Sequence, residues 1–191
     1  MAAIVATTKG KLQGEREGEH VVFKGIRYAS PPVGELRFRA PQEASSWQGV
    51  RRATEFGPRA MQVPNEALEA LLGSPKDQPP MDEDCLYLNV RTPALDDARR
   101  PVMVWLHGGG FAIGAGSDPL YHGSALVDRG VVLVTINYRL GPFGYLCVPD
   151  FASTREDVYA NFGLLDQITA LRWVRSEIGR ASCRERVFGY V

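Results

Sequence analysis

A run of glycines directly after a histidine is the part of this sequence best suited to chemistry. It reads Leu106-His107-Gly108-Gly109-Gly110-Phe111-Ala112-Ile113-Gly114-Ala115-Gly116. Glycines lack a Cβ atom, so the backbone can turn sharply and direct neighbouring N–H groups at one point. A developing oxyanion requires such an arrangement of donors. The loop is therefore predicted to stabilise negative charge, and His107 is expected to orient it by hydrogen bonding rather than to act as a general base.

The glycine run has two other interpretations. Glycines at the end of a strand can simply form a tight turn, but a lone pair of glycines would suffice for that, and three stand between His107 and Phe111. Glycines can also cradle a phosphate at the start of a helix. The chain contains no GxxxxGK[ST], and a GxGxxG beginning at Gly108 would need glycine at position 113, where Ile113 stands. Dinucleotide binding is not expected.

The loop follows a short apolar run that we predict to be a buried strand. Residues 102–106 and 131–136 are both continuous, apolar and rich in β-branched residues. Such runs are typical of parallel strands covered by helices on both faces, and a buried helix is the alternative. Ligands of open α/β sheets bind beyond the carboxyl ends of these strands, which is where the glycine run begins.

The remaining elements suggest an α/β sheet with an antiparallel start. The first forty residues alternate short β-rich runs with turn residues and predict a small antiparallel meander, and residues 85–90 predict a further strand. Residues 56–80 are rich in Pro, Gly and polar residues and are predicted to be mainly a loop between strands, with one short helical candidate at 65–72. A short crossover helix is expected at 124–128, followed by a longer helix capped by Asn161. Its apolar face should contain Leu164, Leu165, Ile168, Leu171, Val174 and Ile178.

Composition and charge indicate an ordinary globular protein without a preferred charged partner. The chain has 191 residues, 45% of them hydrophobic, and 22 basic residues balance 22 acidic ones. Neither nucleic acid nor a membrane surface is therefore expected as a partner. The N-terminus lacks a signal-peptide pattern, and three scattered cysteines form no metal motif. We expect a cytoplasmic protein with reduced thiols and no metal or cofactor.

Six separated motifs occur in this order along the chain: 25–34 (GIRYASPPVG), 36–38 (LRF), 83–90 (EDCLYLNV), 107–111 (HGGGF), 137–141 (NYRLG) and 161–167 (NFGLLDQ). Together they resemble the type-B carboxylesterases, the family that includes the cholinesterases. The resemblance covers residues 4–178. It implies the N-terminal part of an α/β-hydrolase fold, in which a small antiparallel β-meander leads into a mostly parallel central sheet flanked by helices.

The resemblance also implies roles for individual residues. The amides of Gly109 and Gly110 would supply two donors of an oxyanion hole. Ion pairs would join Arg37 to Glu83, and Arg139 to Asp166, beneath the site. Secreted relatives bridge the cysteine at position 85 to one upstream, but Ala60 stands where that partner would be, so Cys85 should be a free, buried thiol.

The catalytic serine that the family requires is missing from these residues. No GxSxG occurs in the chain, and the acid and histidine partners would follow the serine. We therefore assign residues 1–178 to the N-terminal portion of the esterase domain, truncated before the nucleophile elbow. Residues 179–191 do not match the family and are expected to be a non-native, exposed tail, so Ser182 and Cys183 are not expected to be nucleophiles.

The expected function of the parent protein is hydrolysis of a small carboxylic ester through a serine acyl-enzyme, and this chain alone should be inactive. One alternative is a non-catalytic, esterase-like binding domain, which the sequence downstream of residue 178 would distinguish. Residual activity of the chain itself is another, and a fluorophosphonate probe would detect it. The strand at 102–106 should also lack its neighbour, which predicts an aggregation-prone edge.

Overall fold

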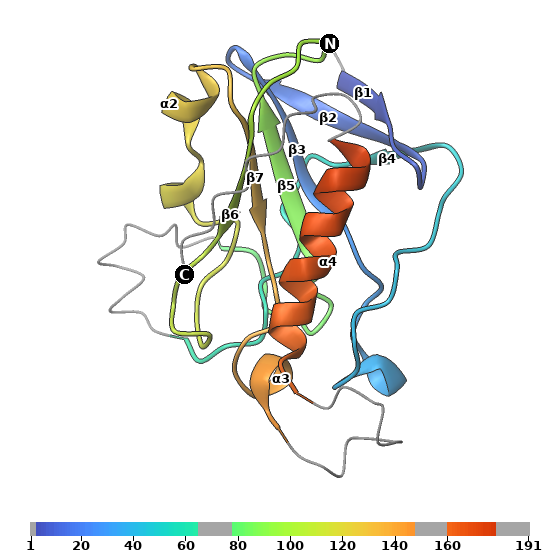
Figure 1. Cartoon of the computed structure of the whole chain (residues 1–191), viewed down its shortest axis with the longest axis vertical. Coiled ribbons are helices and arrows are strands. Elements are labelled where there is room, and N and C mark those ends of the chain that lie inside the picture. Colours follow the sequence, from blue (N-terminus) through green and yellow to red (C-terminus); the bar gives the residue numbers. More distant parts are fainter. Residues whose placement is uncertain (1–2, 65–77, 148–159, 179–191) are drawn as a thin grey trace.

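The structure is a computed structural model that describes residues 3–64, 78–147 and 160–178. One twisted sheet runs through the described part, and a long helix, α4 (Phe162–Glu177), lies across one of its faces (Figure 1). Ala170 and Val174 of α4 are buried together with Val132, Val134 and Ile136 of the sheet in a single hydrophobic core. The apolar face of a helix and that of a sheet are thereby removed from water together.

The chain begins with the expected meander. Strands β1 (Ala3–Ala6), β2 (Lys11–Glu17) and β3 (His20–Arg27) pair antiparallel in sequence, and the short β4 (Val50–Arg52) pairs parallel with β2. A 3-10 turn, η1 (Gly34–Leu36), follows β3. Val21 and Phe23 of β3 are buried, so the meander contributes to the main core.

The two apolar runs form neighbouring parallel strands, as predicted. Strand β6 (Val102–Leu106) pairs in parallel with β7 (Val132–Ile136), and β5 (Tyr87–Thr92) pairs antiparallel with both β7 and β3. The strand order is β1-β2-β3-β5-β7-β6, so the meander and the central strands form one continuous sheet. This described portion is mixed rather than mostly parallel, because β5 runs against both of its neighbours.

Burial differs sharply between the two parallel strands. All five residues of β7 are buried, whereas Val104 is the only buried residue of β6. Strand β6 ends the sheet and pairs with β7 alone among the described strands. The expected edge is therefore present in this part of the chain, while the aggregation it suggests stays a prediction.

Short helical segments connect and flank these strands. Between β6 and β7 lie the 3-10 turn η2 (Pro119–Tyr121) and the helix α2 (Ser124–Val127), and α3 (Gly141–Tyr145) follows β7. Leu133 of β7 faces α2: a Cβ atom on Gly123, the residue before α2, would lie 2.4 Å from Cδ2 of Leu133. Neighbouring Val132 lines a cavity with Trp173 of α4 instead. Alternate residues of β7 thus face α4 and α2, which cover opposite faces of the sheet.

The start of α4 differs in detail from the sequence prediction. Asn161 occupies the cap position, but its side chain makes no capping hydrogen bond; its backbone has φ 59° and its carbonyl accepts from Leu164 and Leu165. Leu164, predicted on the apolar face, is 50% exposed. The buried face consists of Phe162, Gly163, Asp166, Ala170 and Val174. Asp166 can be buried on this face because it pairs with Arg139. Hydrophobic periodicity cannot predict such a pair.

The helical candidate at 65–72 and the tail at 179–191 lie outside the described residues. Within the described ranges, no helix is long and apolar enough to cross a membrane.

Candidate active site

The glycine loop lies at the carboxyl end of β6, beside the segment that follows the carboxyl end of β7. Because β6 and β7 are parallel, both chain segments leave the sheet at the same edge. The loop contacts the second segment directly: Gly141 N–H donates to the carbonyl of Phe111 at 2.7 Å, and the ring of Phe111 lies 4.8 Å from that of Tyr145 in α3. The loop therefore lies, as expected, beyond the carboxyl end of a parallel strand.

Gly109 has a backbone geometry that only glycine can adopt here. Its φ is 125°, and a Cβ atom would lie 2.0 Å from the carbonyl oxygen of Ile113. Its own carbonyl accepts hydrogen bonds from Ala112 at 3.1 Å and Ile113 at 3.2 Å, which closes a tight turn. Gly110 has φ 60° with open space around its Cα. Glycine at 109 is therefore required by both conformation and space, whereas the backbone at 110 only favours glycine, since Phe111 also has φ 60°.

The amides of Gly109 and Gly110 are available as donors. Neither N–H donates in any hydrogen bond between described residues, and both glycines are exposed. The loop carbonyls, by contrast, are engaged at Gly109 and Phe111. Two consecutive free N–H groups beside engaged carbonyls form a site with a local excess of donors, which favours an anionic oxygen.

His107 is buried at the base of the loop. It is 3% exposed, its ring stacks on Tyr138 with centroids 4.4 Å apart, and its Nδ1 lies 2.9 Å from the carbonyl oxygen of Gly108. Burial lowers the pKa of His107 to about 4, so the ring is neutral near pH 7. A neutral ring that bonds a carbonyl through Nδ1 must carry its proton there, which leaves Nε2 as an acceptor.

This geometry suits an orienting residue better than a base. Nε2 of His107 is buried and has no hydrogen-bond partner in the part of the chain that the structure describes. The Tyr138 hydroxyl donates to the His107 carbonyl at 2.6 Å, so this tyrosine holds both the ring and the backbone of the histidine. A buried ring with so low a pKa is a poor proton acceptor at neutral pH.

The returning half of the loop is anchored by polar side chains that the sequence analysis did not single out. Gly116 N–H donates to Asn137 Oδ1 at 2.7 Å, and its carbonyl accepts from Thr135 Oγ1 at 2.7 Å. Gln62 bonds both backbone groups of Gly114. Asn137 could have been found as the first residue beyond a parallel strand, whereas Gln62 lies 52 positions from its partner and carries no local signal.

Both expected ion pairs are present. Arg37 meets Glu83 through two bonds of 2.5 and 2.6 Å, with the arginine side chain 43% exposed. Arg139 bonds Asp166 through Nε at 2.8 Å and Nη2 at 2.7 Å, and its backbone N–H adds a third bond at 3.1 Å. The second pair is buried on both sides and joins α4 to the segment after β7.

Cys85 is a free and buried thiol, as expected, and Ala60 is buried as well. Burial raises the pKa of the Cys85 thiol, so it stays protonated and unreactive. Cys147 is also free but exposed. Among the described residues, no group of three or more His, Cys, Asp or Glu could hold a metal ion.

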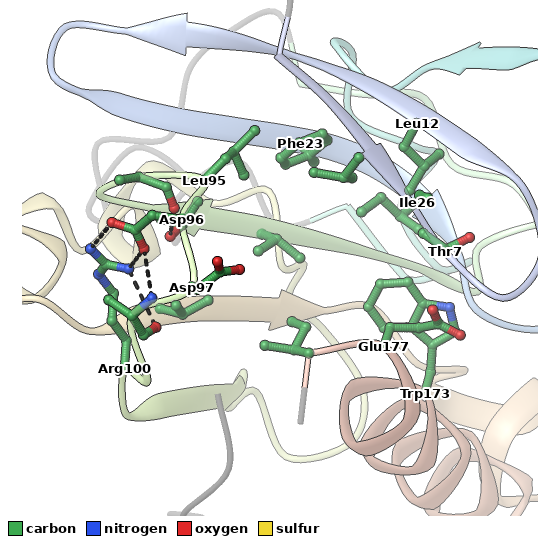
Figure 2. Close-up of a pocket in the computed structure, with 18 residues that line it drawn as sticks. Thr7, Leu12, Phe23, Ile26, Leu95, Asp96, Asp97, Arg100, Trp173 and Glu177 are labelled. Carbon is green, nitrogen blue, oxygen red and sulfur yellow. Dashed lines mark hydrogen bonds and ion pairs between the residues drawn. The ribbon is translucent and has the colours of Figure 1, made fainter. Parts of the chain in front are cut away.

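A cavity of about 400 Å³ lies away from the glycine loop. It opens between the meander and the end of α4, and Leu12, Phe23, Ile26 and Trp173 give it apolar walls (Figure 2). At one end Arg100 Nη2 bonds Asp96 at 2.8 Å. None of residues 107–116 lines it, so this cavity does not serve the glycine loop.

Comparison with known proteins shows the family to which this chain is similar. The carboxylesterase family model matches residues 1–181. Para-nitrobenzyl esterase of Bacillus subtilis is 48% identical over 176 residues, which cover 92% of this chain and 35% of that protein. Phenmedipham hydrolase of Pseudarthrobacter oxydans is 44% identical over 176 residues, with 92% and 34% covered.

Solved structures of carboxylesterases are also similar to this chain. A thermophilic PNB esterase is 45% identical with a TM-score of 0.86, over 97% of this chain and 38% of that one. A carboxylesterase of Geobacillus stearothermophilus is 43% identical with a TM-score of 0.83, over 97% and 37%. The chain has the N-terminal part of the α/β-hydrolase fold and belongs to the carboxylesterase family. It spans about a third of the length of the curated relatives it matches.

Proposed function

We propose that the protein to which this chain belongs hydrolyses carboxylic esters through a serine acyl-enzyme, and that Gly109 and Gly110 form part of its oxyanion hole. The observation that carries this proposal is a pair of consecutive amides, in a glycine turn at the carboxyl end of β6, that donate no hydrogen bond to any described residue. Membership of the carboxylesterase family supports the reaction class. The buried, unpaired Cys85 favours a reducing compartment such as the cytoplasm.

In this reaction a serine Oγ adds to the ester carbonyl carbon, and the π electrons move to the carbonyl oxygen. The N–H groups of Gly109 and Gly110 would donate to that oxyanion. Its collapse expels the alcohol and leaves an acyl-enzyme, which water then hydrolyses to the acid and free serine. A general base from a further part of the protein takes the serine proton and gives it to the departing alkoxide. No GxSxG occurs in these 191 residues, so the nucleophile has to come from a further part of the protein. His107 would hold the loop through the Gly108 carbonyl.

The test requires an enzyme that contains the nucleophile. In what we term the completed enzyme, residues 1–178 are followed by the C-terminal part of the Bacillus subtilis para-nitrobenzyl esterase. Glycolic acid in place of Gly109 or Gly110 replaces the N–H by an ester oxygen and adds no side chain. Each replacement should lower kcat for a nitrophenyl ester by about 10²–10³, the usual effect of losing one such donor.

Gly49 provides the matched control. It also has positive φ and open space around its Cα, and its N–H donates in no hydrogen bond between described residues. Glycolic acid at Gly49 should leave kcat unchanged. Unchanged turnover after replacement of both Gly109 and Gly110 would show that these amides do not stabilise the oxyanion.

A further inference from the structure

Gln62 makes an unusually complete set of bonds to the glycine loop. Its Nε2 donates to the Gly114 carbonyl at 3.0 Å, and its Oε1 accepts from the Gly114 N–H at 2.8 Å. The same Nε2 also donates to the Ala60 carbonyl at 3.0 Å, which fixes the side chain to its own segment. One side chain thus meets both backbone groups of Gly114, as a paired residue of a neighbouring β-strand would.

Gly114 packs against His107, and the residue before it packs against Gly109. A Cβ on Gly114 would lie 2.4 Å from Nδ1 of His107, so its Cα rests against the ring that holds Gly108. The preceding residue, Ile113, presents the carbonyl oxygen that lies against the Cα of Gly109. Displacing Gly114 therefore moves the supports on which Gly109 rests.

The Gln62 restraint is separate from those that come from the sheet. Tyr138 and Asn137 hold His107 and Gly116 from the segment directly after β7. Gln62 instead belongs to the irregular segment that follows β4, and it holds the loop between those two points. Without it, nothing among the described hydrogen bonds fixes the backbone of Gly114.

We propose that Gln62 is a positioning residue for ester hydrolysis: through Gly114 it keeps the Gly109 and Gly110 amides in the geometry that receives the oxyanion. This inference rests on the proposed function. Donors fixed before reaction stabilise the transition state without reorganising, and substrate binding gains little from the same restraint. Loss of Gln62 should therefore lower kcat and leave KM unchanged.

The test uses Gln62→Met and Gln62→Glu in the completed enzyme. Methionine has a similar length but neither donor nor acceptor, and glutamate keeps an acceptor for the Gly114 N–H while losing both donated bonds. Each should lower kcat by about tenfold to a hundredfold, the range that two neutral hydrogen bonds can supply. Gln42→Met is the matched control, because Gln42 is exposed and its side chain bonds, among the described residues, only the Ala40 carbonyl at 3.4 Å.

A trifluoromethyl ketone separates positioning from general stability. The serine Oγ adds to the ketone carbon, and the resulting hemiketal oxyanion occupies the same donors as the transition state. Its inhibition constant should rise by the same factor as kcat falls, while the inhibition constant of the corresponding alcohol, which forms no oxyanion, stays constant. Thermal unfolding of each variant shows that it is folded.

The inference is overturned if kcat and ketone affinity are both unchanged, or if only KM changes. Failure of both variants to fold would also overturn it, because Gln62 would then act on stability rather than on donor geometry. The glycolic acid replacements separate this result from the underlying proposal. If they lower kcat while the Gln62 variants do not, only the positioning role fails; if they leave kcat unchanged, the oxyanion role fails first.

Discussion

His107 is a neutral residue whose proton has a fixed place in the folded protein. Its ring is buried against Tyr138, and Nδ1 faces the Gly108 carbonyl, so charging the ring would bury a cation, a cost that the charge of Asp118 does not offset. This explains why the pKa of His107 falls to about 4 from its ordinary value of 6.5. A histidine beside a glycine loop resembles a catalytic base in sequence, but burial and a low pKa favour the proposed role of His107 in holding the loop.

The pKa of His107 predicts how stability depends on pH. Between pH 6.5 and about 4 the unfolded chain binds the proton and the folded chain does not, so stability is lost as pH falls through this window. Urea unfolding of the completed enzyme at pH 7 and pH 4.5 should show a loss about 2–3 kcal/mol larger than in His107→Gln, which cannot titrate. Equal losses in the two proteins would contradict a neutral His107.

The glycine positions show how far residue-level prediction reached. A histidine followed by three glycines after an apolar run predicted a sharp turn at a strand end, and the structure has that turn, while the oxyanion chemistry stays a prediction. The different demands on Gly109 and Gly110 were not accessible, since they depend on where the Ile113 carbonyl lies. Gln62 was missed for a related reason: a lone glutamine in an irregular segment has no pattern that indicates a partner 52 residues away.

At the level of elements, the Arg139–Asp166 pair connects α4 to the edge of the sheet where the loop lies. Arg139 follows β7 by three residues, and Asp166 faces it from the first turns of α4. Arg139 Nη1 also donates to the Arg39 carbonyl at 2.9 Å, so the pair reaches the segment after η1 as well. A single buried arginine thereby connects three segments that are distant in sequence.

Removing the charge of Asp166 should be strongly destabilising. Asp166→Asn leaves the buried Arg139 without its counter-charge, and such changes typically cost about 3–5 kcal/mol of stability. Glu83→Gln is the matched control, because its partner Arg37 is 43% exposed and water screens the loss. Urea unfolding of both variants in the completed enzyme should show a much larger loss for Asp166→Asn. Similar losses would mean that burial of the pair has little effect.

Strands and helices were predicted correctly where a local pattern of apolar residues defines them. The prediction failed where burial of a residue depends on a partner distant in sequence. The strands at 102–106 and 131–136 followed from continuous β-branched runs, and their parallel pairing was confirmed. The buried face of α4 was wrong at Leu164 and omitted Asp166, because periodicity treats every carboxylate as a surface residue. Asn161 was correctly placed at the helix start, but its left-handed backbone removes the side chain from the capping role.

At the scale of the molecule, one edge of the described sheet is an apolar strand that is only partly buried. Strand β6 is the last of the described strands, and four of its five residues are incompletely buried, although the strand consists only of Val, Met, Trp and Leu. The chain spans about a third of its curated relatives. The glycine loop begins at the carboxyl end of β6, so a further strand paired with β6 would lie beside the loop.

The oxyanion role of Gly109 and Gly110 is tested most directly by a crystal structure of the completed enzyme after reaction with a phosphonate ester. Its tetrahedral serine adduct carries an anionic oxygen in place of the oxyanion. That oxygen should lie about 2.7–3.1 Å from the backbone nitrogens of both glycines. A phosphonyl oxygen directed away from the loop, with both amides bonded elsewhere, would contradict the assignment.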